Sequence, residues 1–397
     1  MYDIIKEKRG ERMLSKIILK NFKSFKYKTE IDFSRTNYKF LEDINVADNG
    51  VLKGTMFVGA NASGKSNIII AIKFLLDLLF REKDVNSRIY KCLFSDQEAF
   101  SIDYYFNVMD KEIRYLITNN PIKNTIFEKL YIDDKLLLDR MGLNARSYIV
   151  NDKETIYDED DLDNETLFLR TLYFNTRFAG NEILKTWFEY LQNSIYINAF
   201  DRDVIPYGKD ELLLDEYLNN QGTASINNFF DKHNFQQTIE YSKEFSNGKI
   251  NLRTGNNNKT VFFRRKDIDT VIPYEEESLG NQTLLNILPS FLNIINKKGM
   301  LLVDEFSSGF HNELEELLIK YFMKASSSSQ IFFVSHSTNL LTTSILRPDQ
   351  IYSVSFDGSE GSWVKRFSDE QPRLAQNIEK MYLSGIFEGL PNYDETK

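Results

Sequence analysis

Several residue types are scarce in this 397-residue chain, and each scarcity excludes a class of protein. With one cysteine, Cys92, and three histidines, we expect neither a disulfide framework nor a zinc site. Only 7 prolines and 18 glycines accompany 42% hydrophobic residues, which excludes collagenous and disordered classes and predicts a large packed core. No apolar run reaches the roughly 18 residues that a membrane-spanning helix needs. We therefore expect a cytoplasmic protein that does not enter a membrane.

Positive charge is not in excess either. The chain carries 49 basic and 58 acidic side chains, a net charge of −9, so it is not a polycation built to coat nucleic acid. Two local basic segments, Lys6–Lys28 and Arg264-Arg265-Lys266, leave duplex DNA open as a partner. The segment Met1–Arg12 lacks the apolar core of a secretory signal, and we expect it to be a loose arm.

Hydrophobic periodicity predicts an α/β fold. Alternating apolar residues predict an antiparallel pair over 14–33 and two hairpins, one over 101–118 that turns at Met109–Lys111 and one over 126–138 that turns around Asp133-Asp134. An acidic segment, 152–165, follows, and we expect it to be a solvated loop or the start of a helix. A helical period continues to about Lys232, followed by strand-like pieces at 250–252 and 260–263. In two separate parts of the chain, 55–80 and 282–334, short apolar strands alternate with helices. The strands are expected at 55–58, 300–303 and 331–334, and the helices at 65–80, 282–295 and 313–324. This predicts an N-terminal β subdomain with half of a core sheet in 1–150, a helical insertion in 151–235 and the second half of the core in 236–397.

Residues 59–66 read Gly-Ala-Asn-Ala-Ser-Gly-Lys-Ser and match the phosphate-loop pattern GxxxxGK[ST] in full. An apolar strand precedes the pattern and a helix follows it, which is the context the pattern requires. Glycines let backbone N–H groups turn toward phosphates, and the helix N-terminus adds partial positive charge. Lys65 is expected to reach the β- and γ-phosphates, and Ser66 to ligate Mg²⁺. The predicted nucleotide-binding residues are Gly59, Asn61, Ala62, Ser63, Gly64, Lys65, Ser66 and Asn67.

A second motif ends the apolar strand at 300–303 with two adjacent carboxylates. Asp304 is expected to hold Mg²⁺ through water, and Glu305 to polarise an attacking water. The strand at 331–334 likewise ends near one polar side chain, His336, about thirty residues later, where a γ-phosphate sensor would lie. His311 is either a helix cap or a dimer contact.

A helix start at Ser278-Leu279-Gly280 precedes these strands. Ser278 and Gly280 could present a hydroxyl and backbone N–H groups to an anion. An ordinary serine cap explains the same residues, and the order of the motifs favours the anion site.

This order of motifs resembles the ABC ATPase superfamily, in its soluble branch. The opening Ile17-Ile18-Leu19-Lys20-Asn21-Phe22-Lys23-Ser24-Phe25 is similar to the start of chromosome-maintenance (SMC), recombination and OLD-type ATPases of the wider AAA class. Later segments resemble the RloA and AbiLi ATPases of abortive-infection phage defence: 304–311, 335–341, Arg347-Pro348-Asp349-Gln350-Ile351, and 377–391. The resemblance covers about Leu14 to Pro391.

The resemblance implies an ABC-ATPase head that hydrolyses ATP with Mg²⁺. Two heads would pack head to tail, the phosphate loop of one meeting Ser278 and Gly280 of the other, and such dimers could build larger assemblies. Asn281 stands where relatives often carry threonine, and Gln97 is the glutamine nearest to the expected Mg²⁺-linked loop. Only 61 residues (397 − 336) follow His336, too few for a C-terminal Toprim nuclease. A separately encoded effector, such as an RloB/Toprim-like nuclease or a toxin, and a phage-derived trigger are therefore implied.

Two other functions remain open from the sequence. One is a DNA repair or recombination ATPase that uses the basic segments, although the net acidity and the lack of sustained heptads count against it. The other is a nucleotide-gated scaffold that holds ATP with negligible turnover.

Overall fold

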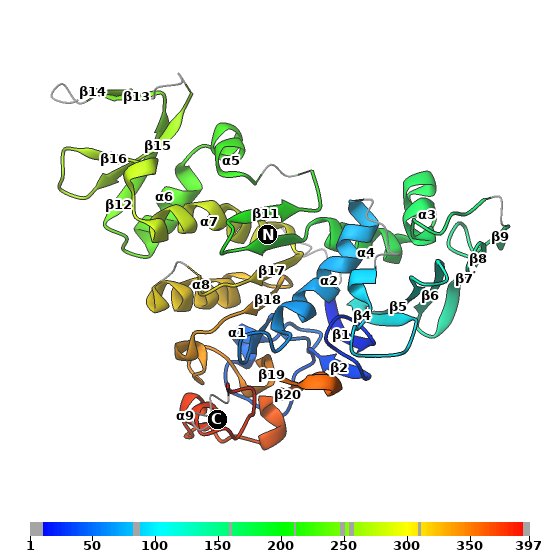
Figure 1. Cartoon of the computed structure of the whole chain (residues 1–397). Coiled ribbons are helices and arrows are strands. Elements are labelled where there is room, and N and C mark those ends of the chain that lie inside the picture. The colour runs from blue at the N-terminus through cyan, green and yellow to red at the C-terminus, as the bar shows by residue number, and fades with distance from the viewer. Residues whose placement is uncertain are drawn as a thin grey trace, which may run out of the picture.

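The computed structural model describes residues 11–81, 88–158, 161–209, 212–246, 251–253, 258–308 and 311–391. Within these ranges the molecule is built on two large sheets with a smaller β lobe at one end (Figure 1). The predicted N-terminal arm lies largely outside the described residues, as does Ile250 of one predicted strand.

The central sheet has seven strands in the order β11-β10-β17-β18-β3-β19-β20. Its five inner strands run parallel and its two edge strands antiparallel. The strands are β3 (Gly54–Val58), β10 (Ile195–Asn198), β11 (Asp203–Pro206), β17 (Met300–Asp304), β18 (Gln330–Val334), β19 (Ile351–Asp357) and β20 (Gly361–Arg366).

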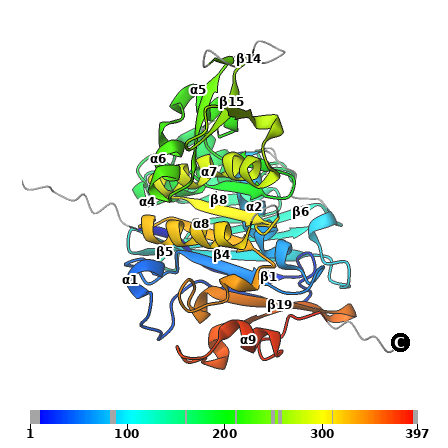
Figure 2. The ribbon, with the colours of Figure 1, turned by 90° about the vertical axis from the view of Figure 1, so that its left-hand side faces the viewer.

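Both faces of this sheet are buried, which explains the nearly continuous apolar runs of its strands. Phe57, Leu302 and Phe332 face one core, which they share with helix α2 (Lys65–Phe80). The neighbouring residues Val58 and Val303 face a second core formed with α7 (Leu279–Lys297) and α8 (Asn312–Ala325). In Figure 2 these last two helices lie across the near face of the sheet, above β19 and α9 (Ile378–Leu383).

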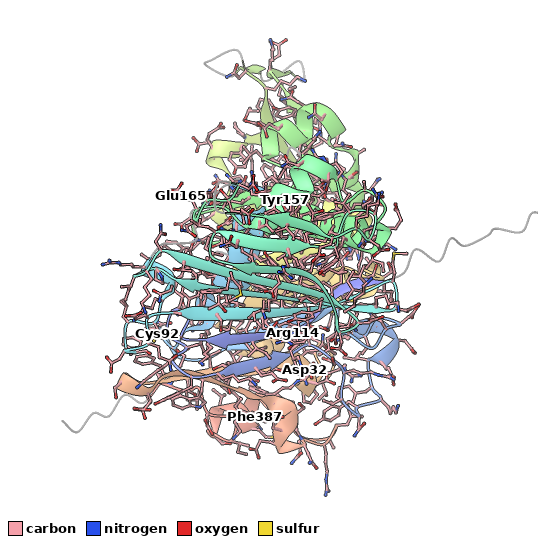
Figure 3. All side chains as sticks on the ribbon, turned by 90° about the vertical axis from the view of Figure 1, so that its right-hand side faces the viewer. Asp32, Cys92, Arg114, Tyr157, Glu165 and Phe387 are labelled. Atoms are coloured by element: carbon pink, nitrogen blue, oxygen red, sulfur yellow. The ribbon has the colours of Figure 1, made fainter. Side chains whose placement is uncertain are left out.

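The second sheet is antiparallel and has eight strands, in the order β2-β1-β4-β5-β6-β7-β8-β9. Figure 3 views it face on, with Asp32 of β2 and Tyr157 of β9 near its opposite edges. Its hairpins turn where predicted, through residues with positive φ at Met109-Asp110 and Asp133-Asp134. The strands are β1 (Arg12–Lys20), β2 (Thr29–Asp32), β4 (Phe100–Val108), β5 (Lys111–Asn120), β6 (Thr125–Ile132), β7 (Lys135–Met141), β8 (Asn144–Ser147) and β9 (Thr155–Tyr157).

The expectation of unbroken helix between 165 and 232 is wrong at two places. Helices α3 (Phe168–Thr176), α4 (Glu182–Gln192), α5 (Leu214–Gln221) and α6 (Ala224–Lys232) are present, but β10 and β11 lie between them. The apolar sequence Ile195-Tyr196-Ile197 fits a buried strand as well as a helical turn, and pairing with β17 decides in favour of the strand. The division at 151 and 235 stays a prediction.

A small β lobe follows α6. Strands β12 (Gln237–Ser242), β15 (Thr260–Arg265) and β16 (Val271–Pro273) form one sheet, and β13 (Glu244–Ser246) pairs with β14 (Asn251–Arg253). Figure 1 shows the lobe projecting beyond α7. Among the described residues, no helix has the length and apolar character needed to cross a bilayer.

Buried polar side chains join the sheets. The fully buried Gln330 of β18 accepts from the Leu14 N–H and the Tyr190 hydroxyl, and donates to the carbonyls of Leu14 and Leu52. Gln350 donates to the carbonyl of Gly54. These bonds tie the end of the chain to its beginning.

A buried ion pair fastens the eight-stranded sheet to α3. Glu128 and Arg140 are both essentially inaccessible, and Arg140 Nη1 lies 2.9 Å from Glu128 Oε1. The Glu128 carboxylate also accepts from the Tyr115 hydroxyl and the N–H groups of Phe168 and Leu169, at the N-terminus of α3. A helix N-terminus and a guanidinium thus share one carboxylate.

We predict that Glu128→Gln lowers the free energy of unfolding by about 3 kcal/mol or more, because it leaves a buried guanidinium without its counter-charge. Urea unfolding followed by circular dichroism measures this. Lys129→Ala is the matched control, since Lys129 pairs with Asp139 at 3.8 Å on the exposed side of the same two strands. The control should cost under about 1 kcal/mol. Equal losses in the two variants would contradict the assigned role of the buried pair.

Candidate functional site

The candidate site lies where four parallel strands end at the same edge of the central sheet. The loop after β3 joins α2, β17 ends in Asp304, His336 follows β18, and β10 ends in Asn198. Because these strands are neighbours running in one direction, polar residues far apart in the sequence meet at their carboxyl ends. A cleft of about 540 Å³ opens there, lined by Asn61, Ala62, Gly64, Lys65, Ser66, Asn67, Phe200, Glu305, Ser308 and His336.

The loop between β3 and α2 depends on two glycines. Gly59 has φ +150°, and a Cβ there would lie 2.3 Å from the carbonyl oxygen of Val354. Gly64, at the start of α2, has φ +107°, and a Cβ would lie 2.5 Å from the hydroxyls of Ser24 and Ser362. Neither position therefore accommodates a side chain without displacement, and the loop keeps the tight turn that a phosphate-binding loop needs.

Lys65 points back onto its own loop. Its Nζ donates to the carbonyls of Gly59, at 3.0 Å, and Ala60, at 2.7 Å. Burial lowers the pKa of Lys65, while the nearby Glu305 and Asp304 raise it. The ammonium group is thus held at the cleft by carbonyls that an anionic phosphate could replace.

The two predicted metal ligands meet directly. Ser66 Oγ donates to Asp304 Oδ1 at 2.8 Å. Burial raises the pKa of the Asp304 carboxyl, partly offset by the bond from Ser66. A hydroxyl and a carboxylate are oxygen ligands of the kind Mg²⁺ prefers. No group of three or more metal-ligating His, Cys, Asp or Glu side chains occurs among the described residues, so Mg²⁺ would need phosphate and water oxygens as well.

Glu305 and His336 face each other across the cleft. Glu305 Oε2 lies 4.0 Å from His336 Nε2, and both side chains are partly exposed. Glu305 has φ +54°, a strained conformation for a side-chain-bearing residue and one common at functional sites. Burial and the charge of Lys65 lower the pKa of His336, which favours the neutral form of its imidazole. A neutral imidazole can both accept and donate a hydrogen bond.

Ser278 and Gly280 do not line this cleft. Ser278 is exposed and caps α7, its hydroxyl accepting from the N–H of Asn281 at 3.4 Å. Helix α7 begins at Leu279, three residues earlier than the periodicity predicts. The Ser278 hydroxyl makes this start possible, because it accepts from an N–H of the first turn that has no carbonyl partner within the helix. Within one chain the structure therefore does not bring Ser278 and Gly280 to the phosphate loop, and their predicted role in a second chain stays a prediction.

Sequence reasoning missed Asn198 and Phe200. Asn198 is the register partner of Asp304 on the next strand, and its Oδ1 accepts from the N–H of Phe200 at 3.1 Å. Phe200 is 72% exposed and lines the cleft. A short apolar strand ending in a polar residue was the signal, and the helical interpretation of 165–232 hid it.

Ser24 and Ser362 were also missed. Ser362 Oγ donates to the Ser63 carbonyl at 2.6 Å, and its hydroxyl lies 2.7 Å from that of Ser24. Asn67 Nδ2 donates to Ser24 Oγ at 2.7 Å. Ser24 falls in the opening string that supports the resemblance, whereas no local signal marks Ser362.

Two further residues are placed away from the cleft. Gln97 does not line the cleft. It lies in the loop before β4, where its carbonyl accepts from the side-chain amide of Asn21. His311 caps α8, its Nδ1 accepting from the Glu313 N–H at 3.4 Å, which supports the cap over the dimer contact.

Comparison with known families identifies the chain. A family model described as "AAA domain, putative AbiEii toxin, Type IV TA system" matches residues 55–342, well over half of the sequence. The chain belongs to this family. The matched range begins in β3 and includes the phosphate loop, Asp304-Glu305 and His336. A comparison with curated proteins gives no match.

The chain is also similar to solved structures. An SMC head bound to the C-winged helix domain of ScpA has a TM-score of 0.50 and 16% identity, covering 88% of this chain and 96% of that one. This likeness shows the SMC-head type of ABC-ATPase fold that the motifs predict. The SMC head domain from Thermotoga maritima has a TM-score of 0.47 and 16% identity, covering 89% and 98%. An SMC head from Pyrococcus furiosus has a TM-score of 0.49 and 15% identity, covering 94% and 99%.

We predict that Lys65→Ala abolishes nucleotide binding, because it removes the cation that would meet the β- and γ-phosphates. Equilibrium titration with a fluorescent ATP analogue measures the affinity. Lys320→Ala is the control, because Lys320 forms an exposed pair with Glu316 on α8. Unchanged affinity in the Lys65 variant would refute the phosphate-loop assignment.

Proposed function

We propose that this protein binds ATP with Mg²⁺ in the cleft and hydrolyses it, and that hydrolysis controls a separate effector in anti-phage defence. The observation that carries the first part is the meeting of Ser66 with Asp304 beside Lys65 and Glu305. Two sequence motifs, more than two hundred residues apart, converge there, and His336 lies beside them at 4.0 Å from Glu305, as nucleotide hydrolysis requires.

Each side chain has a role in this proposal. The loop N–H groups and Lys65 hold the phosphates, and Ser66 and Asp304 hold Mg²⁺, the aspartate through water. Bound Mg²⁺ would neutralise charge that develops on the phosphates. Glu305 accepts the proton of the attacking water, and the neutral imidazole of His336 contacts the γ-phosphate or that water.

We further propose that two chains pack head to tail around ATP. Ser278 is exposed and outside its own chain's cleft, as expected of a group that serves a partner. Its hydroxyl and the positive end of the α7 helix dipole suit an anion. Phe200 and Ser308 line both the cleft and a hollow beside Leu279, so the two surfaces adjoin.

The defence role is supported by family membership and by the RloA- and AbiLi-like segments. The family description names a putative toxin of a type IV toxin–antitoxin system. We propose a nuclease or toxin encoded beside this gene as the partner, released or activated by a phage-derived trigger.

A role on DNA has weaker support. Within the segment 264–266, Arg264 pairs with Glu240, and Arg265 pairs with the buried Glu277 at 2.6 Å. Two of the three cations are therefore engaged by acids of this chain and offer little to a phosphate backbone.

We predict that Glu305→Gln keeps ATP affinity and lowers the hydrolysis rate by about a hundredfold or more, because an amide cannot accept the proton of the attacking water. Single-turnover hydrolysis and equilibrium binding separate the two effects. Glu313→Gln, an exposed change at the start of α8, is the control. Normal hydrolysis by the Glu305 variant would assign the base to another residue.

The effector is sought with the same variant. Expressed from its native genomic context and purified with ATP, Glu305→Gln should retain a neighbouring nuclease or toxin that Lys65→Ala does not retain, as read by mass spectrometry. Recovery of DNA without such a protein would instead support a repair ATPase. A protein recovered alone would refute a stable effector complex, and its ATP turnover would then distinguish a scaffold from an active enzyme.

A further inference from the structure

The last described segment of the chain contacts two loops that border the cleft. After α9 the chain continues through Phe387 to Gly389 beside β19 and β20, at the lower end of the molecule in Figures 1 and 3. The sequence analysis singled out 377–391 for its resemblance to known ATPases, but it assigned these contacts no role.

The first contact is with the phosphate loop. The carbonyl of Gly389 accepts from the N–H of Ala60 at 2.7 Å. Gly389 is buried with φ +76°, and a Cβ there would lie 3.0 Å from Ser353 Cβ and 3.6 Å from Gly59 Cα. The chain therefore packs directly on the backbone of the loop, in a conformation that favours glycine.

Ala60 connects this contact to Lys65. Its N–H donates to Gly389, and its carbonyl accepts from Lys65 Nζ. The two peptide groups that flank the Cα of Ala60 are thus bonded to Gly389 on one side and to Lys65 on the other.

The second contact is with the loop that carries His336. Thr338 Oγ1 donates to Glu379 Oε1 of α9 at 2.5 Å. Thr338 lies two residues after His336, so α9 limits the positions that this histidine can take.

Specific bonds hold the segment in place between these contacts. Glu388 accepts from Trp363 Nε1 at 3.0 Å and from Lys365 Nζ at 3.3 Å. Phe387 stacks on Phe367 with ring centroids 3.8 Å apart, and the Ser353 hydroxyl donates to the Phe387 carbonyl. The segment is thus anchored to β19 and β20, independently of the cleft.

We infer that residues 378–389 form a brace in which Glu379 positions the His336 loop and Gly389 positions the phosphate loop. The brace sets two separable properties of the site. Glu379 acts through Thr338 on hydrolysis, and Gly389 acts through Ala60 on nucleotide affinity. The kinetic part of this inference rests on the proposed ATPase function, whereas the mechanical part does not.

Four variants of the full chain test the brace. Glu379→Ala should lower the single-turnover hydrolysis rate about five- to tenfold with ATP affinity within twofold of wild type, since one bond to a carboxylate is lost. Glu388→Ala should loosen the hold on Gly389 and weaken ATP affinity about fivefold, because two of the bonds that anchor the segment are lost. Thr338→Val removes the hydroxyl that donates to Glu379 and should have the same effect as Glu379→Ala. Thr338→Ser, which keeps the hydroxyl, should keep the wild-type rate.

Hydrogen exchange without nucleotide provides the mechanical readout. Glu388→Ala should speed exchange at the Ala60 amide, and Glu379→Ala should speed it around residues 335–340. Glu154→Ala, which removes a similar bond from the Tyr148 hydroxyl on the eight-stranded sheet, should change neither.

The outcomes separate the two proposals. Unchanged exchange at both loops, or equal losses of rate and affinity in both variants, would overturn the brace. If wild type fails to bind the fluorescent ATP analogue while exchange changes as expected, the brace stands and the proposed function fails.

Discussion

One hydrogen bond, from Ser66 to Asp304, depends on every layer of this structure. It joins the first turn of α2 to the end of β17, residues 238 positions apart. It forms only because β3, β18 and β17 lie side by side in parallel, so that their ends share one edge. That arrangement in turn needs apolar residues on both faces of each strand, packed against α2 on one side and α7 and α8 on the other.

The sequence predicted most of what depends on local pattern. Helix α2 begins and ends where its periodicity and phosphate loop indicate, and the hairpins turn at Met109-Asp110 and Asp133-Asp134. Convergence of Lys65, Ser66, Asp304, Glu305 and His336 followed from one rule, that parallel strands end at one edge. The same rule applied to Ile195–Asn198 would have placed Asn198 beside Asp304, but three apolar residues among helices are too few to show a strand or a helical period.

Contacts between distant segments were not predictable in this way. Ser362 and Gly389 contact the phosphate loop through a hydroxyl and a carbonyl. No sequence pattern marks Ser362, and the resemblance of 377–391 to known ATPases did not indicate what Gly389 would contact. Gln330 and the buried pair Arg347–Asp349 likewise satisfy partners hundreds of residues away. Such residues are recognisable only once the backbone shows which polar groups folding has removed from water.

The charged side chains of the site are partly removed from water without full compensation, which a bound ligand of opposite charge would supply. Burial raises the pKa of Asp304 and lowers those of Lys65 and His336, so in each case removal from water disfavours the charged form. Lys65 is bonded to two loop carbonyls and lies near the carboxylates of Glu305 and Asp304. Asp304 accepts from the Ser66 hydroxyl and the Glu305 N–H. A phosphate with its divalent cation would supply opposite charge to Lys65 and to Asp304 at once. A molecule that bound there would stabilise the folded chain, and under the proposed brace this stabilisation would extend through Ala60 to Gly389 and to the His336 loop.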